Sequence, residues 1–120
     1  MNFHFKQALE EVKHSRTTEG YAETILRSSI KKLYDFRVSD IDEIHFAILK
    51  PESKISTEIH VFVRYRIGIF SEIYISNFYI EYEEILSVFE IIEKHLRDEG
   101  FDCKYVNSYR DNIKRFKILI

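Results

Sequence analysis

The strongest constraint on the fold is a strict alternation of side-chain character between Thr57 and Phe70. One set of alternating positions is apolar or aromatic and comprises Ile59, Val61, Val63, Tyr65 and Ile67. Because successive side chains of a β-strand point to opposite sides, this period of two predicts a strand with one buried face. The second face places an aromatic ring among cationic or titratable groups, namely His60, Phe62, Arg64 and Arg66. That composition suits a binding surface better than plain exposure to solvent.

Apolar residues at helical spacing predict three helical segments. The stripes lie within residues 5–12, 22–33 and 85–96. Asn2 is a good N-cap for the first segment, and the polar cluster at 15–20 predicts a break or kink before the second. Gly100 ends the third stripe, and Phe101 is placed to fold back as in a Schellman motif. Two or three helices are therefore expected.

Four further strands are predicted from alternation and from the turn residues between them. They cover residues 44–49, 73–79, 102–106 and 113–120. Turns are expected at 50–54, near Gly68 and at 107–112. The order α-α-β-β-β-α-β-β indicates an α+β fold, with a mostly antiparallel sheet of about five strands packed by helices on one face. At 120 residues the chain is expected to form one domain over residues 1–120.

Composition excludes several classes of protein. Apolar residues make up 45% of the chain, with three Gly and one Pro, which is typical of an ordered globular domain. The formal charge of −2 provides no whole-chain attraction to nucleic acid or to anionic membranes. Cys103 is the only cysteine, and neither a signal peptide nor an apolar run of about 18 residues is evident. We therefore expect a cytoplasmic protein without a membrane span. The bias toward Ile, Phe, Tyr, Lys and Glu indicates an AT-rich genome, such as that of a low-GC bacterium, its phage or a plasmid.

Catalytic, metal and cofactor motifs are not evident in the sequence. The five histidines lack metal-ligand spacing, and the three glycines do not form a phosphate-binding loop. Cys103 lies beside Lys104 on a predicted strand, and it is expected to be buried and inert. An acidic group, Glu81, Glu83 and Glu84, is expected at a helix start, where the helix dipole favours negative charge. No metal, no cofactor and no enzymatic activity are therefore expected.

Charge and aromatic side chains are the remaining guides to function, because the C-terminal hairpin is basic whereas the helix before it is acidic. If the hairpin lies near the strand at 57–70, basic and aromatic residues gather on one surface. The predicted partner-binding residues are Phe62, Arg64, Arg66, Tyr74, Tyr109, Arg110, Arg115 and Lys117. Aromatic and arginine side chains are enriched among the hot spots of protein interfaces. Another protein is therefore the preferred partner, and aromatics left on the second face are also compatible with a homodimer.

The predicted function is that of a non-enzymatic protein-interaction module, such as a phage or mobile-element accessory inhibitor of a host nucleic-acid enzyme or defence system. The alternative is a nucleic-acid-binding or regulatory protein that uses the basic strand face, since exposed aromatics among cations also bind single strands. Lysine and arginine on an edge strand can instead serve only to block edge pairing. A third class is an enzyme with an unfamiliar site around Glu58, His60 and Arg64.

Overall fold

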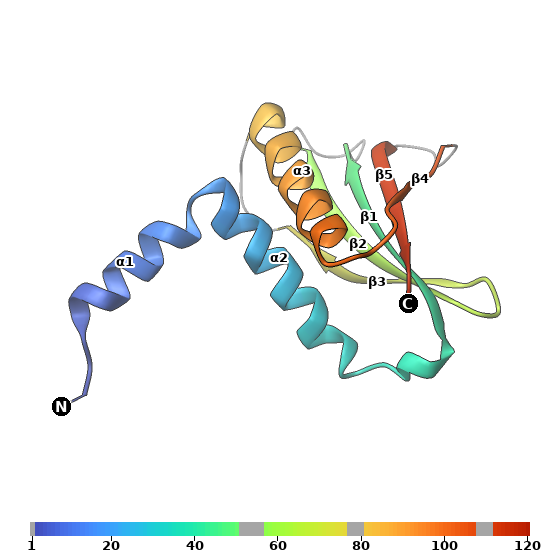
Figure 1. The fold of residues 1–120 in the computed structure, drawn as a ribbon, viewed down its shortest axis with the longest axis horizontal. Coiled ribbons are helices and arrows are strands. Elements are labelled where there is room, and N and C mark those ends of the chain that lie inside the picture. The colour runs from blue at the N-terminus through green and yellow to red at the C-terminus, as the bar shows by residue number, and fades with distance from the viewer. Residues whose placement is uncertain (1, 51–56, 77–80, 108–111) are drawn as a thin grey trace.

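The computed structural model describes residues 2–50, 57–76, 81–107 and 112–120, and within them it confirms the α+β fold and the predicted order of elements (Figure 1). The helices are α1 (Phe5–Ser15), α2 (Thr18–Leu33), the short 3-10 helix η1 (Val38–Asp40) and α3 (Tyr82–Asp98). The strands are β1 (Ile41–Leu49), β2 (Glu58–Tyr65), β3 (Phe70–Ile75), β4 (Lys104–Tyr105) and β5 (Asn112–Leu119). The sheet order is β3-β2-β1-β5-β4, and each neighbouring pair is antiparallel.

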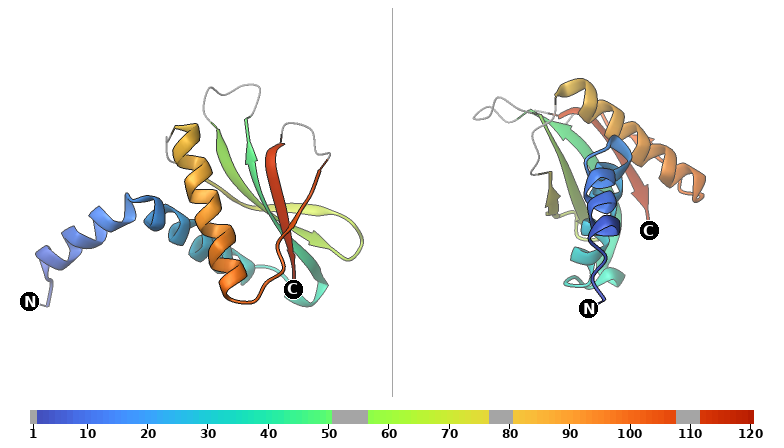
Figure 2. Two further views of the ribbon diagram at one scale, coloured as in Figure 1. Left: turned by 45° about the horizontal axis from the view of Figure 1, so that its top comes forward. Right: turned by 90° about the vertical axis from the view of Figure 1, so that its left-hand side faces the viewer.

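The hydrophobic core lies between the sheet and the helices α2 and α3, which cover the same face (Figure 2). The alternation in β2 is confirmed, because Ile59, Val61 and Val63 are fully buried on this face. In the centre, the Phe116 ring of β5 stacks on Phe46 of β1 and meets Phe89 of α3 edge-on, with ring centroids 5.2 and 5.0 Å apart. These aromatic rings tie α3 to the neighbouring strands β1 and β5.

The strand predicted for 57–70 is too long. Strand β2 ends at Tyr65, and Ile67 is 80% exposed instead of buried. The chain reverses at Gly68, whose φ of 87° lies in the left-handed region, and the Gly68 amide donates to the Tyr65 carbonyl at 2.8 Å. The turn at Gly68 therefore ends the strand at Tyr65, although the alternation of apolar residues continues to Ile67.

Two other strand predictions need correction. Strand β3 begins at Phe70 and ends at Ile75, whereas the prediction placed it at 73–79; residues 77–80 lie outside the described part. Strand β4 contains two residues instead of the five predicted at 102–106, because the chain around Cys103 packs its side chain into the core before pairing with β5 begins. The turns predicted at 50–54 and 107–112 fall largely outside the described residues.

The helix boundaries follow local capping. Gly100, with φ 98°, ends α3 in the predicted Schellman motif: its amide donates to Arg97 and the Phe101 amide donates to Leu96, both at 3.0 Å. Among the described residues His4, and not the predicted Asn2, occupies the N-cap of α1, without a side-chain cap bond. The prediction of Asn2 is wrong because the helix begins at Phe5, the first residue of the apolar stripe, so that the N-cap is the residue directly before it.

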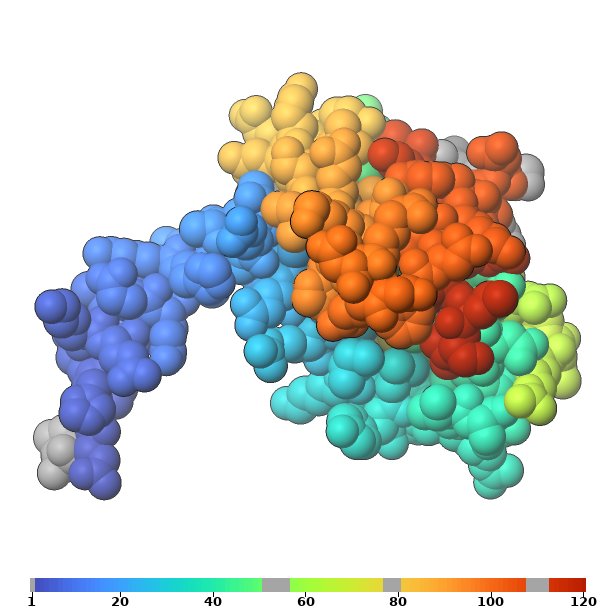
Figure 3. All heavy atoms as spheres, in the orientation of Figure 1, coloured from blue at the N-terminus to red at the C-terminus, as the bar shows by residue number. Residues whose placement is uncertain are grey.

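The predicted break between the first two helices is a tight corner. Thr17 caps α2 by accepting a hydrogen bond from the Gly20 amide at 3.0 Å. A Cβ atom at Gly20 would lie 2.0 Å from the His14 carbonyl oxygen, so only glycine fits there. The corner directs α1 away from the rest of the domain (Figures 1 and 3).

Candidate functional site

The sheet face opposite α2 and α3 carries a connected set of polar and aromatic side chains, and we call it the second face. Its polar and aromatic members, with the small Ala47, are Glu43, His45 and Ala47 from β1, Glu58, His60, Phe62 and Arg64 from β2, Phe70 and Glu72 from β3, and Arg115 and Lys117 from β5; the cross-strand register adds the aliphatic Leu49, Ile75 and Leu119. Cross-strand register brings them together, because His45 lies opposite Phe62 on one side and Lys117 on the other. Several of these polar side chains are buried, and buried polar groups need hydrogen-bond partners.

A chain of hydrogen bonds crosses the centre of the second face. Arg115 Nε donates to His45 Nδ1 at 2.9 Å, and His45 Nε2 lies 2.9 Å from Glu43 Oε1. Because Nδ1 accepts, the proton of the neutral imidazole belongs on Nε2, where it is donated to Glu43. The other Glu43 oxygen accepts from Lys117 Nζ at 2.8 Å, and Arg64 Nε approaches the carboxylate at 4.0 Å. Glu43 is therefore the acceptor at which three strands meet.

The surroundings of these groups decide their charge. Burial lowers the pKa of His45, and the Arg115 charge adds to that effect against the opposing influence of Glu43. Burial by itself would raise the pKa of Glu43, but the hydrogen bonds from Lys117 and His45 outweigh it and leave this pKa below its usual value. The network therefore holds a neutral imidazole next to an ionised carboxylate.

Aromatic rings enclose the Arg115 guanidinium. Its central carbon lies 4.9 Å from the Phe62 ring centroid and 5.2 Å from that of Phe70, both within cation–π range. The His45 ring meets Phe70 edge-on at 5.0 Å. Ala47 lies directly opposite Arg115 and is fully buried, and its small side chain leaves room for the long arginine to reach β2 across β1.

A second cluster surrounds His60. Its Nδ1 lies 2.5 Å from Glu72 Oε2 on β3, and its Nε2 lies 3.3 Å from Glu58 Oε1. The ring also stacks on Phe62, which links this cluster to Arg115. Each ring nitrogen of His45 and of His60 thus lies within hydrogen-bond distance of a polar side chain, and all four of these partners belong to the second face.

The structure brings only part of the predicted binding set together. Phe62, Arg64, Arg115 and Lys117 share the second face, although β5 pairs with β1 and not with β2. Arg66 lies in the turn after β2, where it pairs with Asp42 at 3.3 Å. Tyr74 does not lie on the second face: it packs, partly buried, against the core on the helix side, and burial raises its pKa. Tyr109 and Arg110 lie outside the described residues.

Sequence analysis missed the acidic and histidine members contributed by neighbouring strands. Glu43, His45, Phe70 and Glu72 were not predicted as site residues, yet they supply most of the partners of the cationic groups. For two of them the sequence contained a usable pattern, because Glu43 and His45 occupy polar positions that alternate with apolar residues in the segment that forms β1. Recognising it required the register between β1, β2 and β5.

Other candidate sites are limited within residues 2–50, 57–76, 81–107 and 112–120. No group of three or more His, Cys, Asp or Glu in this part of the chain could hold a metal ion. Cys103 is buried, as predicted, and burial raises the pKa of its thiol. Glu83 and Glu84 lie in the first turn of α3, in agreement with the predicted helix start.

No protein-family model, curated protein or solved structure matches this chain. None of the helices formed by the described residues has both the length and the apolar character that crossing a membrane requires.

Proposed function

We propose that the chain is a non-enzymatic binding protein whose preferred partner is another protein, and that the second face forms part of the binding surface. The observation that carries this proposal is charge compensation. Lys117 and Arg64 approach Glu43, and Arg66 pairs with Asp42. A surface whose cations already have carboxylate partners attracts phosphate groups less strongly than a purely basic one. It retains the aromatic and arginine anchors typical of protein interfaces.

The ring contacts support binding in preference to acid–base chemistry. A general base needs a lone pair directed toward a substrate. The His45 nitrogens face Arg115 and Glu43, and the His60 nitrogens face Glu72 and Glu58. Held in this way, both imidazoles act as rigid parts of a preformed surface, which lowers the entropy cost of association.

A more specific role belongs to the same proposal: a cytoplasmic accessory inhibitor from a phage or mobile element, directed at a host nucleic-acid enzyme or defence system. Its support is the small size, the AT-biased composition and the single cysteine of the chain. Nucleic-acid binding is the second candidate. It is favoured by the partial exposure of Arg64 and Lys117, whose side chains are 36% and 32% accessible, next to the Phe62 ring.

The test is affinity capture from a low-GC bacterial lysate with the tagged protein, before and after nuclease treatment. We expect one protein partner that survives nuclease and is lost from Arg64→Glu, while the control Lys32→Glu, an exposed position on α2, retains it. Capture that disappears with nuclease and weakens steeply with added salt would overturn the protein-binding proposal in favour of nucleic acid. Equal capture by wild type and Arg64→Glu would show that the second face is not the surface.

A further inference from the structure

Helix α1 presents an apolar stripe that its own domain leaves uncovered. None of the residues Phe5–Ser15 is buried, and Phe5, Leu9 and Val12 are 69%, 42% and 49% exposed. These three side chains, with Ala8, recur at the spacing of one helix face. Isolated helices shorter than about 12–15 residues are marginal in water and depend on tertiary packing. The 11 residues of α1 therefore need a surface on which to dock.

The polar side of α1, and not the stripe, faces α2. The hollow between the two helices is lined from α1 by polar side chains that include Gln7, Glu11 and His14. The corner at Gly20 keeps this orientation, because the glycine contacts the His14 carbonyl oxygen too closely for any side chain. Figure 3 shows α1 extending from the body of the domain. The stripe thus faces away from its own chain.

An apolar groove of about 620 Å³ lies at the C-terminal ends of α2 and α3. It is lined by apolar side chains from segments far apart in sequence, including Ile30, Tyr34, Val38, Phe101 and Ile120. All five are exposed, and Tyr34 is 87% accessible. Contiguous apolar surface from several elements is typical of an interaction site.

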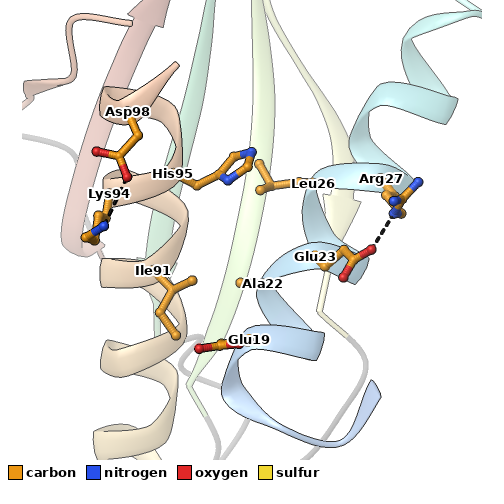
Figure 4. Close-up of a pocket in the computed structure, with 9 residues that line it drawn as sticks. All are labelled: Glu19, Ala22, Glu23, Leu26, Arg27, Ile91, Lys94, His95 and Asp98. Atoms are coloured by element: carbon orange, nitrogen blue, oxygen red, sulfur yellow. Dashed lines mark hydrogen bonds and ion pairs between the residues drawn. The ribbon is translucent and has the colours of Figure 1, made fainter. Parts of the chain in front are cut away.

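The groove continues between α2 and α3. A neighbouring hollow has Ala22, Leu26 and Ile91 among its lining residues and charged side chains along both helices (Figure 4). Leu26, Arg27 and His95 line both hollows, so the two form one channel along the helix pair.

We infer that this channel receives α1 from a second copy of the chain, with Phe5, Leu9 and Val12 of one protomer lying against the groove of its partner. The stripe and the groove belong to one sequence, so a second copy supplies both halves of the contact. A two-fold arrangement makes each interaction twice and leaves neither surface uncovered. The inference does not depend on the function proposed for the second face.

Charges at the edges of the two surfaces are complementary. On the helical wheel of α1, Glu11 flanks the stripe on one side and Lys6 on the other. The apolar part of the groove has Arg27 and Lys31 on its α2 edge and Glu99 on its α3 edge, and within the protomer Arg27 pairs with Glu23 and Glu99 with His95. Among the ion pairs of the described residues none involves Glu11, Lys6 or Lys31, so these three charges are available for contacts between protomers. Opposite charges on the two edges also specify one direction for the docked helix.

The experiment measures the mass of the full chain by sedimentation over a range of concentrations. We expect a dimer for the wild type and about a hundredfold weaker dimer for Leu9→Glu or Ile30→Glu, because each substitution buries a carboxylate in both contacts. Gln7→Glu is the matched control: it adds the same charge on the polar side of α1, near the helix N-terminus where it is favourable, and should leave the dimer intact. A circular dichroism spectrum of each variant checks that the body remains folded.

Mixing distinguishes reciprocal exchange from other contacts. Leu9→Glu keeps an intact groove and Ile30→Glu keeps an intact stripe, so an equimolar mixture should regain dimer through one contact although each variant by itself is monomeric. Disulfide trapping identifies the occupant: Val12→Cys mixed with Ile30→Cys should give covalent heterodimers. A wild type that is monomeric throughout, a dimer unaffected by both substitutions, or a trapped bond within one Val12→Cys, Ile30→Cys chain would each overturn the inference.

Discussion

The two faces of the sheet are made by alternate residues of the same strands, yet they are held together by different forces. On the helix side, Phe46, Phe116 and Phe89 pack ring against ring, and removal of apolar area from water stabilises the fold. On the second face, Arg115 and His45 are buried as well, but their stability depends on each partner being present. Burial alone therefore does not distinguish a core from a preformed polar surface; the chemistry of the buried groups does.

Truncation in the apolar core should give the largest effect. Phe116→Ala removes the ring that joins β1, β5 and α3, and it leaves a cavity that the sheet closes only in part. We expect a loss of about 3–5 kcal/mol in the free energy of unfolding, measured by urea denaturation. A loss below about 1 kcal/mol would mean that the rings do not form a close-packed core.

Breaking the polar network should cost less than breaking the core. Arg115→Ala leaves the buried His45 Nδ1 without its donor and removes the cation between Phe62 and Phe70. The expected loss is about 2–3 kcal/mol in the same denaturation experiment. Arg115→Met is the matched variant, since it keeps an apolar stem between the rings, and it should recover part of that loss. If both variants match the wild type, the network does not stabilise the second face.

The two faces should also differ in their response to pH. Because the pKa of His45 is lowered in the folded state, the unfolded chain binds the proton first, and stability falls as the pH drops below about 6.5. The lowered pKa of Glu43 adds a further loss as the pH falls below about 4.5 toward the folded-state value. His45→Gln should flatten the first part of this profile, whereas Ile48→Val, a change in the apolar core, should shift the whole curve downward without changing its slope.

The smallest expected effect concerns the rim of the second face. Lys117→Met breaks the contact with the buried Glu43 carboxylate, and we expect a loss of about 0.5–1 kcal/mol because Lys117 remains partly exposed. Lys94→Met breaks a fully surface-exposed pair with Asp98 and should change stability by no more than about 0.5 kcal/mol. Urea denaturation of both variants gives the two losses in the free energy of unfolding. A larger loss for Lys117→Met would show that burial of Glu43 strengthens its ion pair relative to the exposed pair of Lys94 and Asp98.

Local patterns in the sequence predicted much of the fold. The alternation in β2, the apolar stripe of α3 and the glycine stop at Gly100 each depend on residues close together in the chain. Errors occurred where the alternation of a strand competed with a turn or with packing into the core. The turn at Gly68 ended β2 before Ile67, and packing of Cys103 under α3 shortened β4.

The candidate site was less accessible to sequence analysis. Phe62 and Arg64 could be assigned to one face from the period of two, since side chains of a strand alternate. Their partners Glu43 and Phe70 come from other strands, and no local pattern states which strands pair or in which register. Tyr74 shows the same limit, because the irregular register between Val61 and Phe62 places it toward the core.

The sequence by itself thus determined the kinds of elements, some of their ends and, for β2, the division into an apolar and a polar side, since these depend on side-chain periodicity and turn residues. Only the tertiary structure decided that β5 pairs with β1 and that Ala47 leaves room for Arg115 to reach Phe62. The physical reason is that these outcomes depend on contacts between residues distant in the chain. Such contacts are selected by the packing of the whole molecule.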